Sequence, residues 1–493
     1  MKNLKLIFTT LITIIISSCS EFEEINTNPN NVKETHPQLL LTNIEVEAFQ
    51  VNGTSSLYAS RMLVSSDSEN NEQYYNWDSA SFDKYSALGE ITKMIQEATR
   101  IKAPEYIALG KFFRAYYFYN LALTFGDIPY SEALQGEFNK VYFPTYSTQK
   151  EVFKGILIEL AEANNILKTN NNIIDGDIIF KGNTYKWRKL INSFRLKILL
   201  SLSKQEETSE LNIKSSFANI FANEPIISSS DENAQIVFID TDGARYTEFN
   251  SSGYGSGMYM AKTFVNLLKE RNDPRLFIFC TQTKNAKENG LAINDFNAYN
   301  GADALKPYGE INTLAAAGEL SKVNLRYSTD PTTEAHNILG YWEMEFILAE
   351  AAIRRWIITD AKEHYNNGIR ASFNFYNKQA KGLENYVNAN AANNYIQGIK
   401  VNFDSATTVE QQLEFILTQK YFTSFLQTGW RMYFDFLRTG YPKLPFDASA
   451  TPPTRWMYPN SEYTENSKNT KAAVINQFGE GNDKTRELTW WLK

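Results

Sequence analysis

The segment Tyr106-Ile107-Ala108-Leu109-Gly110-Lys111-Phe112-Phe113 decides the fold class of this chain. An aromatic residue, a Leu-Gly pair and a second aromatic residue follow one another at the spacing expected along a helix. A residue as small as Gly110 lets a partner helix approach closely. The segment therefore predicts a helix that packs against another helix.

A second segment carries both halves of such a helix pair. Leu348-Ala349 takes the place of the Leu-Gly pair, and Ala361 and Tyr365 stand twelve and sixteen residues beyond Ala349, followed by the small residue Gly368. These spacings, like the segment around Gly110, match the tetratricopeptide repeat. An ordinary antiparallel helix pair shows similar spacing and remains the alternative. The predicted fold class is mainly α, with tetratricopeptide-like helix pairs.

Further helices and long loops complete the predicted body. Apolar residues recur at steps of three and four in three more segments, at about 148–168, 185–204 and 409–428. Long polar segments lie between the helices, at 67–83, 240–259 and 285–327. Loops of this length in a compact domain are usually functional or disordered. Little β-structure is expected, with a hairpin near residues 235–240.

The first residues have the layout of a secretory signal. Two lysines precede an apolar run at residues 6–16, and two serines come directly before Cys19. The run is shorter than the roughly 20 apolar residues that a membrane-spanning helix needs. Residues 1–18 are therefore predicted to be a signal peptide that is removed.

Cys19 stands at the predicted cleavage point and resembles the lipobox cysteine of bacterial lipoproteins, which carries acyl chains such as palmitate. Several acyl chains make a durable membrane anchor. The alternative is an ordinary signal with a chance cysteine at the cut. Residues 19–36, rich in Glu and Asn, are predicted to be a lipidated N-terminus and solvated tether. No Pro/Gly/Ser-rich linker interrupts residues 37–493, which are predicted to form a single domain.

Charge and cysteine content exclude several classes of partner. The formal net charge of −7 becomes −9 when the two lysines of the signal peptide are removed. A chain with this balance and no basic run is not expected to bind nucleic acid or anionic lipid head groups. Cys280, the other cysteine, lies in an apolar stretch and is predicted to be a small buried residue.

The sequence contains no recognisable catalytic or metal-binding motif. The three histidines are far apart and share no ligand-like spacing, so no metal site and no cofactor are expected. Glu343 and Glu345 are predicted to be surface charges of a helix, because a glycosidase pair must face each other across a cleft. Calcium binding at Asp240 and Asp242 is left open, although the sequence around them has too few oxygen ligands at the spacing of an EF-hand loop. The chain is therefore predicted to be a binding protein and not an enzyme.

One cluster of aromatic residues stands out because it lies in a polar loop without helical period. Tyr74, Tyr75 and Trp77 lie among amide and carboxylate side chains between residues 67 and 83. Exposed flat rings with polar neighbours suit sugar rings, so these three are predicted ligand-binding residues. The alternative is that the rings pack down over the helices.

Five segments together resemble the SusD/RagB-like nutrient-binding outer-membrane lipoproteins. Their sequences, in order along the chain, are Phe22-Glu-Glu-Ile-Asn-Thr-Asn-Pro-Asn30, Gly126-Asp-Ile-Pro-Tyr130, Asn272-Asp-Pro-Arg-Leu276, Arg438-Thr-Gly-Tyr-Pro-Lys443 and Arg455-Trp-Met-Tyr-Pro459, the last followed by Glu462 and Asn466. The resemblance implies a helical body on tetratricopeptide-like pairs, with long loops that carry the ligand surface. The matched motifs themselves are predicted to be architectural.

The resemblance also implies a function and a location. Such proteins lie on the outer face of the outer membrane as a lid over a SusC-like TonB-dependent barrel, and they capture oligosaccharides or, in some members, peptides. The sequence thus predicts a surface lipoprotein that delivers oligosaccharides to that transporter. A peptide-binding lid, a lipidated secreted hydrolase and a surface scaffold protein are the alternatives.

Overall fold

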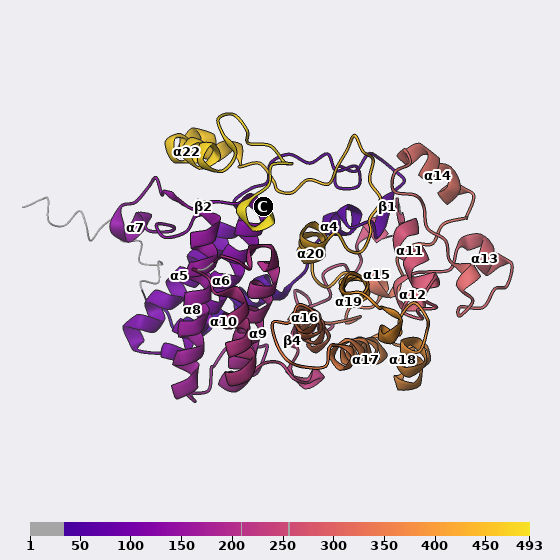
Figure 1. The fold of residues 1–493 in the computed structure, drawn as a ribbon, viewed down its shortest axis with the longest axis horizontal. Coiled ribbons are helices and arrows are strands. Elements are labelled where there is room, and N and C mark those ends of the chain that lie inside the picture. Colours follow the sequence, from indigo (N-terminus) through magenta and orange to yellow (C-terminus); the bar gives the residue numbers. More distant parts are fainter. Residues whose placement is uncertain (1–33, 209, 255–256) are drawn as a thin grey trace, which may run out of the picture.

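The computed structural model describes residues 34–208, 210–254 and 257–493. The predicted signal peptide, Cys19 and residues 19–33 of the predicted tether lie outside the described residues. Helices dominate and form two groups that lie side by side (Figure 1). Among the described residues, no helix is long and apolar enough to cross a membrane.

The first group contains the N-terminal helices, each packed on its neighbour in space. Its members are α3 (Pro37–Phe49), α5 (Lys84–Ile101), α6 (Pro104–Phe125), α8 (Gln149–Thr169), α9 (Thr184–Ser201) and α10 (Ile213–Asn223). The second group holds the later helices. Its members are α11 (Lys262–Lys269), α12 (Leu276–Phe279), α13 (Lys284–Glu288), α14 (Tyr308–Ala316), α15 (Arg326–Thr329), α16 (Tyr341–Ile353), α17 (Ala361–Gln379), α18 (Ala389–Ile396), α19 (Val409–Thr423) and α20 (Arg431–Thr439).

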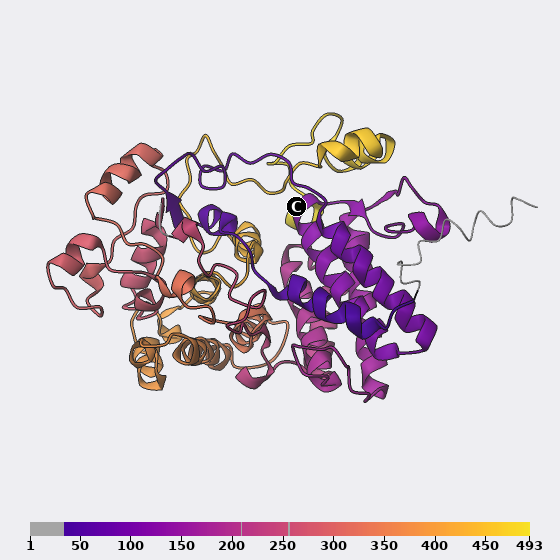
Figure 2. The ribbon, with the colours of Figure 1, turned by 180° about the vertical axis from the view of Figure 1, so that it is seen from behind.

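Short helices and connecting segments join the groups. The short helices are α4 (Ser55–Ala59), α7 (Gly136–Asn139), α21 (Asn460–Glu465), α22 (Ser467–Phe478) and the 3-10 turns η1 (Ser203–Gln205), η2 (Ser230–Glu232), η3 (Ser252–Tyr254), η4 (Phe296–Ala298), η5 (Glu384–Tyr386), η6 (Phe403–Ser405) and η7 (Trp490–Leu492). Seen from behind, the chain crosses from α3 to α4, which lies beside the second group (Figure 2). The C-terminal segment returns to the first group, where the Trp491 N–H donates to Gln149 Oε1 at 3.0 Å.

The helices predicted from periodicity are present. Residues 148–168 form α8, which begins with a capping box: the Thr148 hydroxyl accepts from the Glu151 N–H, and the Glu151 carboxylate accepts from the Thr148 N–H. The other two predicted segments form α9 and α19, and α19 ends at Thr423, before the predicted end near residue 428.

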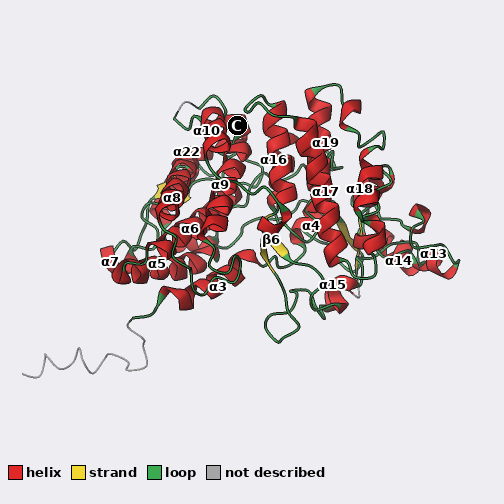
Figure 3. Ribbon diagram, turned by 90° about the horizontal axis from the view of Figure 1, so that it is seen from below, coloured by secondary structure: helices red, strands yellow, loops and turns green. Residues whose placement is uncertain are grey.

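Close helix approach at small residues confirms the predicted helix pairs. α16 and α17 pack along their length, and a Cβ on Gly368 would lie 2.5 Å from the Phe346 ring. In α6, a Cβ on Gly110 would lie 2.3 Å from Ile95 Cγ1 of α5. Figure 3 shows the helices of the two groups in red, with long green loops at their ends.

The β-structure consists of three two-stranded antiparallel sheets in the described part of the chain. They pair β1 (Leu63–Ser65) with β5 (Met258–Met260), β2 (Ile128–Pro129) with β3 (Tyr146–Ser147), and β4 (Ala234–Ile236) with β6 (His336–Leu339). The predicted hairpin near residues 235–240 is wrong, because β4 pairs with a distant strand. The chain turns after β4, and Arg245 holds that turn by pairing with Asp240 at 2.7 Å and Asp242 at 2.6 Å.

The prediction that Glu343 and Glu345 are helix-surface charges is also wrong. Only 8% of Glu343 and 6% of Glu345 is exposed, because α9, α17 and α19 cover α16 on several sides. Glu343 pairs with Lys197 of α9, and Glu345 Oε2 lies 2.7 Å from His364 Nδ1 of α17. Buried carboxylates need such partners, so both glutamates tie α16 to its neighbours.

Three arginines from the sequence motifs form buried ion pairs. Arg275 pairs with Asp273 at 2.6 Å and donates to Gln419 of α19 at 2.7 Å. Arg438 of α20 pairs with Glu350 of α16, and Arg455 pairs with Asp483. These contacts fit the predicted architectural role of the motifs. Cys280 is buried, as predicted.

Candidate binding site

A cavity of about 490 Å³ lies where the two helix groups meet. Four segments far apart in the sequence line it: residues 47–52 at the end of α3, 80–84 at the start of α5, 116–125 of α6, and 428–434 at the start of α20. The exposed side chains of Asn52, Ser81 and Lys84 are part of this lining, so the cavity reaches the protein surface. Its volume falls in the range of pockets that hold small ligands.

Aromatic rings form part of the cavity wall. Tyr116 and Tyr117 of α6 have ring centroids 5.3 Å apart, and Trp430 and Phe434 come from the start of α20. Tyr116 and Trp430 are only partly buried, whereas Tyr117 and Phe434 are buried. The wall therefore offers flat apolar surface to a ligand.

Trp430 is held in place by three rings behind it. Its ring centroid lies 5.5 Å from that of Trp77, 4.6 Å from that of Trp456 and 5.6 Å from that of Tyr433. Trp77 in turn stacks on Trp456 at 5.0 Å with an interplanar angle of 20°. Edge-to-face and stacked rings of this kind stabilise one another beyond their burial, so the Trp430 side chain is fixed before any ligand arrives.

The predicted ligand-binding loop lies behind this wall. The expectation of exposed rings is wrong for Tyr75 and Trp77, which are 1% and 6% exposed. The Tyr75 hydroxyl donates to the Ala59 carbonyl at 2.9 Å, and its ring lies 3.8 Å from the Arg61 guanidinium carbon. The loop folds onto α4 and α20, so its large rings fill the core between them.

Tyr74 is the partly exposed member of the predicted set. Its hydroxyl donates to the Lys306 carbonyl at 2.9 Å, across the loop that precedes α14. Neither Tyr74 nor Tyr75 is among the residues that line the cavity, and Trp77 reaches it only through Trp430. Ligand contact by these three residues stays a prediction.

Two buried hydroxyls in the cavity lining have no hydrogen-bond partner within the described residues. They are Tyr117 Oη and Thr428 Oγ1. Burial raises the pKa of Tyr117 well above its usual value, so the hydroxyl is neutral and can donate. An unsatisfied buried hydroxyl costs about 1–3 kcal/mol, which a ligand hydroxyl or a water would recover.

The residues of the cavity wall were missed by the sequence analysis. Tyr116 and Tyr117 follow an apolar helix pattern and look like core residues, while Trp430 is one aromatic among many. No local signal marks them, because the cavity exists only where segments more than 300 residues apart meet. The aromatic residues of α6 were the sequence feature that came closest to indicating the cavity wall.

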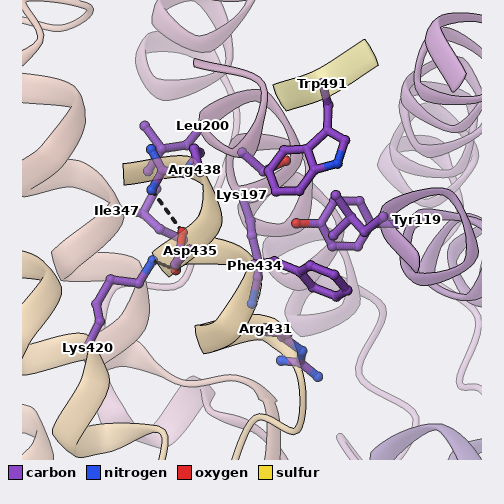
Figure 4. Close-up of a pocket in the computed structure, with 12 residues that line it drawn as sticks. Tyr119, Lys197, Leu200, Ile347, Lys420, Arg431, Phe434, Asp435, Arg438 and Trp491 are labelled. Carbon is purple, nitrogen blue, oxygen red and sulfur yellow. Dashed lines mark hydrogen bonds and ion pairs between the residues drawn. The ribbon is translucent and has the colours of Figure 1, made fainter. Parts of the chain in front are cut away.

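A second, smaller cavity of about 20 Å³ lies between α9, α19 and α20 and is surrounded by charge (Figure 4). Lys197 pairs with Glu343, Lys420 pairs with Asp435, and Arg438 Nη2 lies 2.8 Å from Asp435 Oδ1. Burial lowers the pKa of Lys197 to about 8 despite the neighbouring Glu343. A space of this size has room for about one water, so the cluster joins the helix groups and holds no substrate.

No group of three or more His, Cys, Asp or Glu side chains suited to a metal ion occurs within residues 34–208, 210–254 and 257–493. His336 is buried, and burial lowers its pKa to about 3. Its Nδ1 accepts from the Val51 N–H at 3.0 Å, so the neutral ring is a core residue beside the cavity-lining segment 47–52.

Fold and cavity together define a helical binding protein with an aromatic-walled cavity. A family model described as starch-binding and associating with the outer membrane matches residues 29–459. The chain belongs to this SusD-like family, as its sequence motifs predicted. The family is one of binding proteins associated with the outer membrane.

Solved structures share this fold over nearly the whole chain. A SusD homologue from Bacteroides fragilis is 46% identical, with 93% of this chain and 100% of that chain covered and a TM-score of 0.90. An outer membrane protein from Bacteroides vulgatus, whose name associates it with nutrient binding, is 44% identical with the same coverage and a TM-score of 0.90. A further SusD homologue from Bacteroides fragilis is 31% identical, with the same coverage and a TM-score of 0.87. Among curated proteins, none matches the chain significantly.

Proposed function

We propose that this protein is a lipid-anchored receptor that captures nutrient oligosaccharides in the cavity between its helix groups and delivers them to a SusC-like TonB-dependent transporter. Its anchor would be Cys19 in the outer membrane, with the folded body on the extracellular side. The role is capture and transfer without catalysis.

The aromatic wall with unpartnered hydroxyls carries this proposal. Tyr116 and Trp430 offer ring faces to the C–H faces of sugars, and the hydroxyls of Tyr117 and Thr428 can bond to sugar hydroxyls. Trp430 is already ordered by Trp77 and Trp456, so binding would not need to order it. Names of relatives that refer to starch and nutrient binding support the same class of ligand.

Calorimetry with oligosaccharide pools and the purified whole chain tests the site. We expect Trp430→Ala to weaken binding by about tenfold or more, since tryptophans that a ligand covers are typical hot spots. Tyr142→Ala is the control, because this ring is 65% exposed and is not among the residues that line the cavity. Equal affinity of the Trp430→Ala variant and the parent chain would place the ligand elsewhere.

Tyr117→Phe separates ligand binding from stability, because it removes only the hydroxyl. The variant should bind oligosaccharide more weakly yet unfold at the same or a higher denaturant concentration, since the hydroxyl has no protein partner in the described part of the chain. A loss of stability without a loss of affinity would contradict the proposed role. If the protein binds peptide pools and not oligosaccharides, its ligands are peptides and the proposed ligand class is wrong.

Delivery to a transporter is tested by co-purification. A tagged chain extracted from outer membranes in mild detergent should bring down a large barrel protein of the TonB-dependent class. If the protein binds its ligand but brings down no such partner at native expression levels, it is a surface receptor and the proposed delivery step is wrong.

A further inference from the structure

Arg431, at the first position of α20, belongs to both the large cavity and the charged cluster beside it. One Nη1–H donates to the Ile338 carbonyl, and one Nη2–H donates to the Tyr116 hydroxyl at 3.4 Å. The remaining donors of the guanidinium, Nε among them, have no partner in the described part of the chain. The Arg431 side chain is part of the lining of the large cavity.

The carboxylates of the neighbouring cluster are all held by other cations. Glu343 pairs with Lys197, Asp435 pairs with Lys420 and Arg438, and Glu350 pairs with Arg438. No carboxylate of the described residues forms an ion pair with Arg431. Figure 4 shows Arg431 at the edge of the cluster, at a distance from Asp435 and the side chains that Asp435 contacts. Arg431 is therefore a cation of this cluster that forms no ion pair within the described residues, and the nearby Glu343 carboxylate is paired with Lys197 instead.

A partly buried guanidinium without a counter-ion favours an anionic ligand. Arginine presents planar paired donors that match a carboxylate or sulfate, and charge-assisted hydrogen bonds are roughly twice as strong as neutral ones. Two further observations point to a ligand at the same place. The buried hydroxyls of Tyr117 and Thr428 lack partners, and no side chain caps the start of α20, whose first residues line the cavity.

Charges at the cavity mouth are balanced. Lys84 and Glu47 both line it and are both exposed, and neither forms an ion pair within the described residues. The nitrogen of Lys84 lies 5.8 Å from the centroid of the Tyr117 ring. Of the three charged residues that line the cavity, Arg431 is the one that is not exposed.

We propose that the ligand is an acidic oligosaccharide whose uronate carboxylate is bound by Arg431, while its hydroxyls contact Tyr117 and Thr428 and its sugar faces contact Trp430. This inference rests on the proposed function and specifies its substrate class. Ring faces and hydroxyl partners favour a sugar acid over an acidic peptide, whose amide backbone needs fewer hydroxyl contacts.

A pair of ligands that differ only in charge tests the proposal on the unaltered whole chain. Calorimetry would compare oligogalacturonate with the same oligomer after methyl esterification, which keeps the sugar backbone and removes the negative charge. We expect the acid to bind about tenfold or more tightly than the ester, with an affinity that falls as salt rises. A sulfated neutral oligosaccharide is the third ligand, and binding as tight as that of the uronate would overturn the assignment to a carboxylate.

Variants then assign the charge preference to Arg431. Arg431→Gln should lower affinity for oligogalacturonate by about tenfold or more and leave affinity for the ester within about threefold, whereas Arg431→Lys should retain part of the preference. Arg370→Gln is the matched control, because Arg370 is exposed on α17 and is not among the residues that line the cavity. Thermal unfolding of each variant checks that the contact to Ile338 is not needed for folding.

The outcomes separate this inference from the proposed function. If the ester and the acid bind equally in the cavity, the acidic-ligand inference fails and oligosaccharide capture stands. If an aspartate-rich peptide binds while both oligosaccharides fail, both are overturned. A charge preference that survives Arg431→Gln would assign it to another residue and overturn the role of Arg431.

Discussion

At the residue scale, Trp77 shows that a polar stretch of sequence can contribute a core residue. Its neighbours in the sequence are amides and carboxylates, yet its ring is buried between Trp430, Tyr433 and Trp456. The alternative noted for this loop, that its rings pack down on the helices, describes Tyr75 and Trp77. Tyr74 is the member of the set that remains partly exposed.

Substitution of Trp77 by alanine should therefore lower stability. The loss of a buried tryptophan opens a cavity, and we expect the free energy of unfolding to fall by about 3–5 kcal/mol. Tyr74→Ala should cost on the order of 1 kcal/mol, since one hydrogen bond to the Lys306 carbonyl is lost. Chemical denaturation measures both. Equal effects of the two substitutions would mean that Trp77 is not part of the packed core.

Glu45 of α3 is a buried acid with an unusual titration. It is 0% exposed, its Oε2 accepts from the Ile178 N–H at 2.8 Å, and its Oε1 has no partner among the described residues. Burial, together with the nearby charge of Asp177, raises the pKa of Glu45 to about 10 from its ordinary value of 4.5. The native protein thus keeps a proton that the unfolded chain releases.

This difference predicts how stability depends on pH. Between about pH 4.5 and pH 10 the unfolded chain binds fewer protons at this residue, so Glu45 contributes less and less stability as the pH rises. Glu45→Gln cannot ionise, so its stability relative to the parent chain should increase from about pH 5 to pH 8. Unfolding free energies across that range measure the trend. A difference that stays constant with pH would show that Glu45 has an ordinary pKa.

At the element scale, α16 explains why a helix can carry charge and still be buried. Its apolar residues occur on every side, and α9, α17 and α19 pack around it. Glu343 and Glu350 therefore meet cations of α9 and α20. The paired helices α16 and α17 approach each other closely at Gly368.

Two glycine substitutions separate helix packing from helix propensity. Gly368→Ala should destabilise the protein by about 1–3 kcal/mol, since the new methyl would lie 2.5 Å from the buried Phe346 ring. Gly89→Ala, in α5, should stabilise it by about 0.5–1 kcal/mol, because no atom lies within 4 Å of the added Cβ. Thermal unfolding compares the two. The packing explanation fails if both variants gain stability.

At the scale of the whole molecule, two helix groups meet at one cavity, and the described body begins at Glu34. Arg100 at the end of α5 holds that start, with Nη1 3.0 Å from the Glu34 carboxylate. The predicted anchor, Cys19, precedes this contact by 15 residues in the sequence and lies outside the described residues. A lipid there would hold the whole body at the membrane surface.

Loss of the anchor should therefore release the protein from the membrane. We expect Cys19→Ala to lose acylation and to leave the membrane fraction, whereas Cys280→Ala should stay, because Cys280 is buried in the fold. Fatty-acid labelling with membrane fractionation measures both effects. If the Cys19→Ala chain remains with the membrane without lipid, contacts with a partner hold it there.

The sequence by itself determined the helical class, the positions of α8, α9, α16, α17 and α19, and the family. Those features depend on local properties, such as the apolar period of 3.6 residues, the capping box at Thr148 and the motifs Gly126–Tyr130 and Arg455–Pro459. Only the tertiary structure decided that Trp77 and Glu343 are buried, that β4 pairs with β6, and that Tyr116, Trp430 and Arg431 share one cavity. Burial and cavity walls depend on which distant segments pack together, and no local pattern encodes a partner 300 residues away.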